Sequence, residues 1–227
     1  MKIKTVDVGN TAVDICEYEN GELKFLGKFT HKEEIRETLK DGDKIIVCSV
    51  RPSLNEFLRR VGKNLEFITV KEINMASEYE SMETLGTDRL LFAYGVKKLY
   101  SRDALLVSAG TSLVVDLMIE GTFKGGFITC GLSTKARALS ERAEQLPLIE
   151  PKIFKKDIGR DTISAMEGGI YLESLHFIIS LKEKYESLFK KTIPIYITGG
   201  EGMYFEELGF YDPLILHKAM IEWERER

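Results

Sequence analysis

Short apolar runs separated by turn residues mark the beginning of the chain. Apolar residues precede Asp7, an alternating run covers residues 12–16, and residues 23–29 can pair back on that run. Such runs are typical of strands, and Asn20-Gly21 between the second and third runs is a strong hairpin signal. We therefore expect the chain to open with an antiparallel meander of three strands.

Helix and strand patterns alternate after this meander. Residues 44–50 form an apolar run of strand length, which we expect to be buried on both faces. Around it we expect a polar helix over 31–40 ended by Asp41-Gly42-Asp43, a helix from Pro52 to Val61 closed by Gly62, and a strand over 65–70. Meander, helix, strand, helix, strand is the order of an RNase H-like α/β domain.

A polar, irregular segment over 72–85 leads into the next helix. Gly86-Thr87-Asp88-Arg89 begins this helix. Its apolar side is expected to carry Leu90, Leu91, Tyr94 and Leu99. The helix dipole favours an acid in the first turn, which alone explains Asp88 but not the whole cluster.

The same order of elements returns in the second half. We expect a strand over 104–107, a glycine-centred turn over 108–112, strands over 113–119 and 122–129, helices over 133–145 and 163–189, a strand over 194–198 and a last helix over 214–224. The repetition indicates an internal duplication, with one domain over 1–103 and another over 104–227. The fold class is then α/β, with two duplicated RNase H-like domains and a cleft between them for a nucleotide's phosphates.

The long helix expected over 163–189 contains Gly168-Gly169. Glycine inside a helix costs roughly 1 kcal/mol relative to alanine. We therefore expect another element to pack closely against this helix.

Composition and charge exclude several classes of function. The chain has 227 residues, of which 44% are hydrophobic and 30% charged, with a formal charge of −4. These values predict a soluble globular protein and argue against a broad nucleic-acid surface. We expect no signal peptide and no membrane span, because no apolar run reaches the necessary length.

Cysteine and histidine are few and scattered. Cys16, Cys48 and Cys130 lie far apart, and we expect all three to be buried free thiols in a reducing cytoplasm. The three histidines form no metal-binding spacing and are expected to be surface or satisfied core residues.

The turn after the first strand carries candidate chemistry. Free backbone N–H groups around Gly9, Asn10 and Thr11 could cradle a phosphate chain, with Gly9 allowing close approach and Asn10 accepting a left-handed conformation. A carboxylate beside phosphates is repulsive unless a cation lies between them, so Asp7 is a candidate Mg²⁺ ligand, directly or through water. The alternative is a hairpin turn in which Asp7 caps its own backbone.

These stretches, taken in order, resemble type III pantothenate kinase, a branch of the actin-like and sugar-kinase ATPase superfamily. The resemblance rests on Asp7–Thr11, Tyr79, Gly86–Arg89, Ala109-Gly110-Thr111, Gly125-Gly126, Leu146-Pro147, Gly159 with Thr162, and Thr198-Gly199-Gly200. It implies ATP-dependent phosphorylation of pantothenate to 4'-phosphopantothenate, the first step of coenzyme A biosynthesis. It also implies a cytoplasmic homodimer that needs Mg²⁺ and a monovalent cation, K⁺ or NH₄⁺.

The resemblance also implies roles for individual residues. ATP-binding positions are Asp7, Val8, Gly9, Asn10, Thr11, Ala12, Val13, Asp14 and Thr111. Substrate-binding positions are Tyr79, Gly86, Thr87, Asp88, Arg89 and Thr162. Among them Asp88 resembles the general base, and Thr162 resembles the threonine that completes the pantothenate pocket from the neighbouring subunit.

One departure from the family pattern concerns the monovalent cation. Ser108 stands where the family usually has an aspartate that binds this cation. A hydroxyl offers only a neutral lone pair, so we expect little dependence on K⁺ or NH₄⁺. Cys130 and Met82 also replace usual prolines, and these changes are interpreted as loop adjustments.

Two other functions remain open from the sequence. One is a small sugar or acetate kinase of the same superfamily, against which Tyr79 and the lack of a longer sugar-binding insertion argue. The other is a non-catalytic nucleotide-binding relative that acts as a transcription-accessory protein, which Ser108 keeps open. Asp7, Asp88 and Arg89 together favour the kinase, because positioned phosphoryl transfer would use all three.

Overall fold

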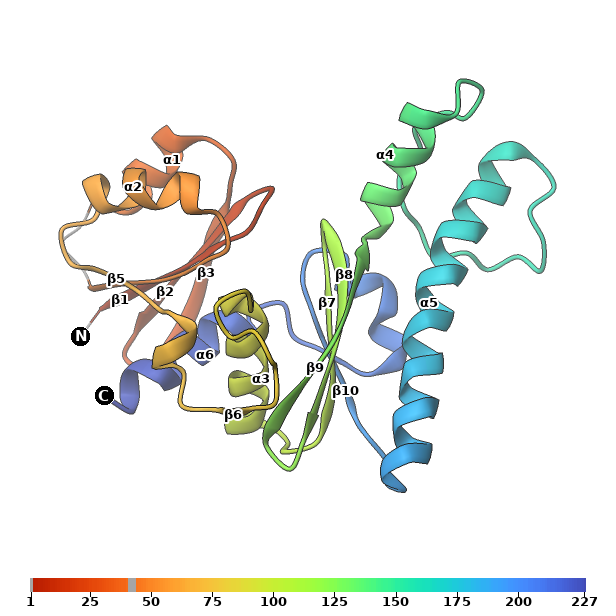
Figure 1. Cartoon of the computed structure of the whole chain (residues 1–227). Coiled ribbons are helices and arrows are strands. Elements are labelled where there is room, and N and C mark those ends of the chain that lie inside the picture. Colours follow the sequence, from red (N-terminus) through yellow and green to blue (C-terminus); the bar gives the residue numbers. More distant parts are fainter. Residues whose placement is uncertain (1, 41–43) are drawn as a thin grey trace. The chain divides into compact units, whose positions relative to one another are not determined.

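The computed structural model describes residues 2–40 and 44–227 (Figure 1). The chain forms two compact units. The first contains residues 1–102, 121–123 and 214–227, and the second contains 103–120 and 124–213. The expected terminator of the first helix, Asp41-Gly42-Asp43, lies outside the described residues.

A five-stranded sheet is the centre of the first unit. Its order is β3-β2-β1-β4-β5. The strands are β1 (Ile3–Val8), β2 (Val13–Glu19), β3 (Glu22–Phe29), β4 (Lys44–Ser49) and β5 (Leu65–Phe67). β1 is antiparallel to β2 and parallel to β4. The hairpin between β2 and β3 turns at Asn20 and Gly21, whose positive φ angles of 54° and 91° suit a tight two-residue turn.

Helices cover both faces of this sheet (Figure 1). On one face, α1 (Lys32–Thr38) and α2 (Pro52–Val61) share a core with Val6, Val8 and the other side chains that point the same way. On the other face lie α3 (Thr87–Leu99) and α6 (Ile215–Arg225), which contact β1 and β4. The two helices are close because Gly95 has no side chain: a Cβ there would lie 2.7 Å from the Cβ of Ala219.

The second unit contains strands in the order β11-β10-β7-β8-β9. They are β7 (Ala104–Ala109), β8 (Ser112–Ile119), β9 (Thr122–Cys130), β10 (Ile195–Thr198) and β11 (Phe210–Tyr211). Its helices are α4 (Leu132–Arg142), α5 (Thr162–Phe189) and the 3-10 helix η2 (Gly202–Leu208). In the first unit, η1 (Val70–Glu72) is a further 3-10 turn, and β6 (Ala76–Ser77) pairs with Thr122 and Phe123 at the start of β9.

The strand pairing supports an internal duplication. In the first unit, β1 has an antiparallel neighbour after a short turn and a parallel neighbour from later in the chain. In the second unit, β7 has the same two kinds of neighbour, β8 and β10. Glu120 and Gly121 have positive φ angles of 54° and 74°, as Asn20 and Gly21 do. The proposed division at 103/104 follows the order of the repeated elements along the sequence. The compact first unit differs from it because this unit also includes α6 from the end of the chain.

Several expected elements end elsewhere. The strand expected over 65–70 ends at Phe67, because Thr69 and Glu72 form a capping box that begins a 3-10 turn. Leu99 is 37% exposed, so its placement on the buried side of α3 was wrong. That helix is instead buried on all sides from Arg89 to Val96, since β4 and α6 both contact it.

Other expectations concern single residues. Cys16 and Cys48 are buried free thiols, as expected, but Cys130 is exposed at the end of β9. Gly168 packs tightly, because a Cβ there would lie 2.9 Å from the ring of Phe154. The expectation fails for Gly169, where an added Cβ would meet no atom within 4 Å. Across the described ranges, no helix combines the length and apolarity needed to cross a membrane.

Candidate active site

The first turn lies between β1 and β2. Gly9 N–H donates to the carbonyl oxygen of Ala12 at 3.1 Å, and Asn10 and Thr11 are exposed. Neither Gly9 nor Asn10 has a positive φ angle, so the turn does not use the left-handed conformation that Asn10 would accept. The Gly9 N–H is bound within the turn, so it is not one of the free donors expected here.

Strand periodicity determines which face carries the first candidate residues. Val6 and Val8 point toward α1 and α2. Thr5 points to the opposite face, where its hydroxyl is 2.8 Å from Nδ1 of His217 on α6. Asp7 follows the alternation of Thr5, and its register partner on β2 is Asp14. Two carboxylates therefore lie on the α3/α6 face of the sheet.

Burial and neighbouring carboxylates strongly affect Asp7. Burial, followed by the charges of Asp88 and Asp14, raises the pKa of Asp7 to about 7, while the charge of Lys28 opposes the change. Burial also raises the pKa of Asp14, although Lys28 Nζ lies 3.6 Å from its Oδ2. The structure thus brings Asp88 into the electrostatic neighbourhood of Asp7.

These carboxylates suit a divalent cation. Asp14 Oδ1 is buried and has no hydrogen-bond partner in the part of the chain that the structure describes. Like charges directly opposite one another on paired strands are destabilising, and a cation would relieve that repulsion. The described residues contain no group of three or more histidine, cysteine or acidic side chains that could hold a metal. An ion here would therefore take one or two carboxylates from the chain and its other ligands from phosphate and water, as Mg²⁺ usually does.

The start of α3 determines the position of Asp88. Gly86 is the N-cap of α3, and Asp88 lies in the first helical turn of α3, where the helix dipole favours a negative charge. A Cβ at Gly86 would lie 2.5 Å from Oδ1 of Asp88. Glycine at this position therefore leaves space for the carboxylate beside the helix start.

Two aromatic rings surround Arg89. Its guanidinium lies 5.3 Å from the ring centroid of Tyr79 and 5.8 Å from that of Phe123. The two rings pack against each other at 6.2 Å, and Phe123 accepts a backbone hydrogen bond from Glu78 at 2.9 Å. Phe123 thus orders both Tyr79 and Arg89. Sequence reasoning missed it, because Phe123 is distant in sequence and looked like an ordinary strand residue.

The second turn lies between β7 and β8. Ser108 is partly buried and lies beside Thr198 of β10. The carbonyl oxygen of Thr111 accepts hydrogen bonds from Gly131 N–H at 3.1 Å and from the Thr134 hydroxyl at 2.6 Å. The beginning of α4 therefore holds the backbone of this turn.

Glu201 connects the second turn to the segment after β10. Its carboxylate accepts hydrogen bonds from the backbone N–H groups of Leu132 at 2.8 Å and Ser133 at 2.9 Å. Its own N–H donates to Ala109 at 2.9 Å. Sequence reasoning missed this residue, because the acid that caps α4 comes 69 positions later in the chain.

Thr162 is the first residue of α5 and is exposed. With Leu139, Met166 and Gly169 it lines a cavity of about 800 Å³ between α4 and α5. Thr162, Ser108 and Thr111 belong to the second unit, whereas Asp7, Asp14, Tyr79 and Gly86–Arg89 belong to the first. Within the first unit, Asp14 and Asp88 lie near Asp7, and Arg89 lies beside Tyr79.

Solved structures with a similar fold include proteins from Campylobacter jejuni and Sinorhizobium meliloti. A protein assigned to the Baf family of transcriptional activators from Campylobacter jejuni has a TM-score of 0.67 at 20% identity, covering 98% of both chains. A protein assigned as a 2-dehydro-3-deoxygalactonokinase from Sinorhizobium meliloti has a TM-score of 0.59 at 11% identity, covering 99% of this chain and 98% of that one. At such identities the likeness concerns the fold alone. Together with the repeated strand pairing, it confirms the expected fold class of two duplicated α/β domains.

Sequence comparison identifies the family. The family model of type III pantothenate kinase matches residues 5–184. The type III pantothenate kinase of Aquifex aeolicus (strain VF5) is 41% identical over 220 residues, which cover 97% of this chain and 96% of that protein. This chain therefore belongs to the type III pantothenate kinase family.

Proposed function

We propose that this chain transfers the terminal phosphoryl group of ATP to pantothenate, giving 4'-phosphopantothenate and ADP in the first step of coenzyme A biosynthesis. The observation that carries the proposal is the 41% identity with a type III pantothenate kinase along nearly the whole chain. The clustering of Asp7, Asp14 and Asp88 supports it, because this is the charge that a metal-dependent phosphoryl transfer requires.

Asp88 is assigned as the general base. The pantothenate hydroxyl oxygen attacks the terminal phosphorus, its proton passes to the Asp88 carboxylate, and the bond from that phosphorus to the ADP oxygen breaks. Phosphoryl transfer has a loose transition state, so positioning and charge neutralisation dominate. A carboxylate can serve because the proton is able to leave late.

Tyr79, Arg89 and the backbone around Gly86 and Thr87 are assigned to bind pantothenate. The planar fork of donors on Arg89 suits a polar oxygen of the substrate. The rings of Tyr79 and Phe123 beside it limit its movement. Because the Arg89 side chain is already ordered, less conformational entropy is lost when the substrate binds.

ATP is assigned to the first turn, Asp7–Asp14, together with Thr111 of the second unit. Mg²⁺ bound there would neutralise the phosphate charge. The groups of this chain that would hold Mg²⁺, directly or through water, are the Asp7 carboxylate and Asp14 Oδ1, which has no hydrogen-bond partner among the described residues.

Ser108 leads us to propose that a monovalent cation contributes little. A neutral hydroxyl attracts K⁺ less than a carboxylate does. The rate should therefore change little when K⁺ replaces Na⁺, and Ser108→Asp should gain activation by K⁺. Steep K⁺ activation of the unmodified enzyme would contradict this proposal.

We further propose that the enzyme is a cytoplasmic homodimer packed through α5. The exposed position of Thr162 and the open surface at Gly169 support a partner at this helix. The two buried free thiols, Cys16 and Cys48, support a reducing compartment.

A coupled ADP-release assay tests the activity. Pantothenate should stimulate ADP release in the presence of Mg²⁺, whereas a panel of sugars and acetate should not. Stimulation by a sugar alone would favour the other kinase function. No stimulation by any substrate, with ATP still bound, would favour a regulatory protein such as the Campylobacter jejuni neighbour's description suggests.

A further inference from the structure

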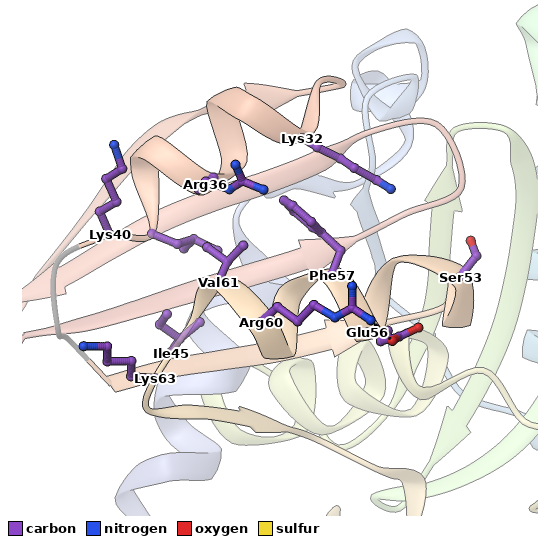
Figure 2. A pocket seen from close by; sticks show the side chains of 11 residues that line it. Lys32, Arg36, Lys40, Ile45, Ser53, Glu56, Phe57, Arg60, Val61 and Lys63 are labelled. Carbon is purple, nitrogen blue, oxygen red and sulfur yellow. Dashed lines mark hydrogen bonds and ion pairs between the residues drawn. The ribbon is translucent and has the colours of Figure 1, made fainter.

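A basic groove lies between α1 and α2, on the face of the first sheet opposite to Asp7 (Figure 2). It encloses about 620 Å³, which is within the range of small-molecule sites. Its five basic side chains are Lys32, Arg36, Lys40, Arg60 and Lys63. The groove therefore concentrates positive charge in a chain whose formal charge is −4.

The charge comes from two helices and the residues that follow them. Lys32, Arg36 and Lys40 are spaced four residues apart, which aligns them along one side of α1 and its end. Arg60 and Lys63 come from α2 and the segment after it. Figure 2 shows Lys32 at one end of the groove and Lys40 and Lys63 at the other. Lys32 and Arg36 lie one helical turn apart on α1, and Lys40 follows the end of this helix, so the positive charge is extended rather than gathered at one point.

Among the residues that the structure describes, acidic partners leave most of this charge uncompensated. Glu56 is the one described acid that lines the groove, and it pairs with Arg60. Lys40 pairs with Glu37, which lies outside the lining. Both pairs are well exposed, and exposed pairs exchange easily with other partners. Lys32, Arg36 and Lys63 form no ion pair with any described residue.

An aromatic ring supports the two cations on α1. Phe57 extends from α2 between the basic side chains (Figure 2). Lys32 Nζ lies 5.4 Å from the ring centroid, and the Arg36 guanidinium lies 5.8 Å from it. Cation–π contacts with the Phe57 ring restrict both side chains before an anion binds. Less side-chain entropy is therefore lost on binding.

We propose that this groove binds an oligophosphate chain, either inorganic or as the tail of a nucleotide. An anion with several charges along its length matches cations on both sides of an elongated groove, whereas a single phosphate reaches only some of them. Arginine and lysine are the residues that bind phosphate oxygens most effectively. The site is separate from the carboxylates of the candidate active site, because the sheet lies between them.

The test is a titration of the ¹⁵N-labelled full-length chain with tripolyphosphate at constant ionic strength. Backbone amide shifts should saturate together over α1 and α2, with a dissociation constant below about 1 mM, and orthophosphate should bind at least about tenfold more weakly. ATP provides a second arm: tighter groove binding by ATP identifies a nucleotide, and equal or weaker binding identifies a free oligophosphate. Because shifts are resolved by residue, binding at the first turn is distinguished from binding in the groove.

Matched variants distinguish a site from diffuse attraction. Lys32→Gln with Arg36→Gln should weaken tripolyphosphate binding at least about tenfold, because both removed charges face the groove. Arg59→Gln with Lys24→Gln removes the same amount of charge from residues that do not line the groove. This double variant should change the dissociation constant for tripolyphosphate by less than about twofold. Equal losses in the two double variants, or equal binding of orthophosphate and tripolyphosphate, would overturn the proposal. All four substituted residues lie outside the assigned catalytic groups, so ADP release with pantothenate should be retained.

Discussion

At the scale of single residues, Asp7 lies among other negative charges, and we propose that it helps to hold a metal ion. It is partly buried beside Asp14 and within reach of the charge on Asp88, and these surroundings raise its pKa to about 7. Such an arrangement is unfavourable for an empty protein near neutral pH. It becomes favourable when a divalent cation is present, which is the role that we propose for Asp7.

The raised pKa predicts how stability changes with pH. The pKa of Asp7 is 3.8 in the unfolded chain and about 7 in the fold, so between these values the folded protein binds more protons. The contribution of Asp7 to the free energy of unfolding is therefore fully present below pH 4 and is lost as pH rises toward 7. Without Mg²⁺ or nucleotide, Asp7→Asn should stabilise the protein by about 2 kcal/mol at pH 8 and by much less at pH 5.

Thermal unfolding at the two pH values provides the measurement. Asp157→Asn is the matched control, because Asp157 is exposed and its substitution should give no such pH-dependent gain. Destabilisation by Asp7→Asn at pH 8 would contradict the assigned environment of Asp7.

The residue patterns selected several candidates for this site, and their roles stay predictions. Asp7 and the glycine turn were found because an acid at the end of an apolar strand is unusual, and Asp88 because it accompanies Gly86 and Arg89. Strand alternation then places Asp7 and Asp14 on one face. The effect of Asp88 on Asp7 could not be predicted, since α3 follows β1 by about eighty positions and only tertiary packing determines its placement.

At the scale of elements, local signals predicted where strands and helices begin more reliably than how they pack. The helix Pro52–Val61 appeared as expected, because proline starts it and Gly62 follows its end. The return of α6 to the first sheet has no local signal. It depends on the contact of Gly95 with Ala219 and on the hydrogen bond of His217 to Thr5. Burial lowers the pKa of His217 to about 4, so this contact is neutral at physiological pH.

The start of α4 gives a prediction about an element. Glu201 accepts two backbone hydrogen bonds there, and a charged acceptor at a helix N-terminus contributes more than a neutral one. Glu201→Gln should destabilise the protein by about 1 kcal/mol. It should also raise KM for ATP several-fold, because α4 holds the backbone at Thr111.

Chemical denaturation and steady-state kinetics check this pair of effects. Glu206→Gln serves as the control, because Glu206 is exposed on η2 and contributes no bond to α4. A change in stability with an unaltered KM for ATP would mean that Glu201 has only a structural role.

At the scale of the whole molecule, the fold alone does not identify the reaction. A protein assigned as a transcriptional activator and one assigned as a sugar kinase share it with this chain. The family relationship and the chemistry of the residues on the α3/α6 face determine the function that we assign.

The proposed dimer gives a prediction at this scale. Gly169→Glu places a charge in the open apolar surface of α5, so light scattering should show a loss of dimer and the pantothenate-dependent rate should fall. Leu188→Glu makes a comparable change at an exposed residue near the end of the same helix and should retain the dimer. A fully active monomer of the unmodified protein would contradict the proposal.

Product formation by the unmodified enzyme and by Asp88→Asn tests the central claim most directly. With ATP, Mg²⁺ and pantothenate, ³¹P NMR should show a new phosphomonoester signal for the unmodified enzyme. Asp88→Asn should slow its appearance by about 10²-fold to 10⁴-fold, the range for a lost general base, while ATP binding is retained. Absence of the product with the unmodified enzyme, or an unchanged rate in Asp88→Asn, would contradict the account.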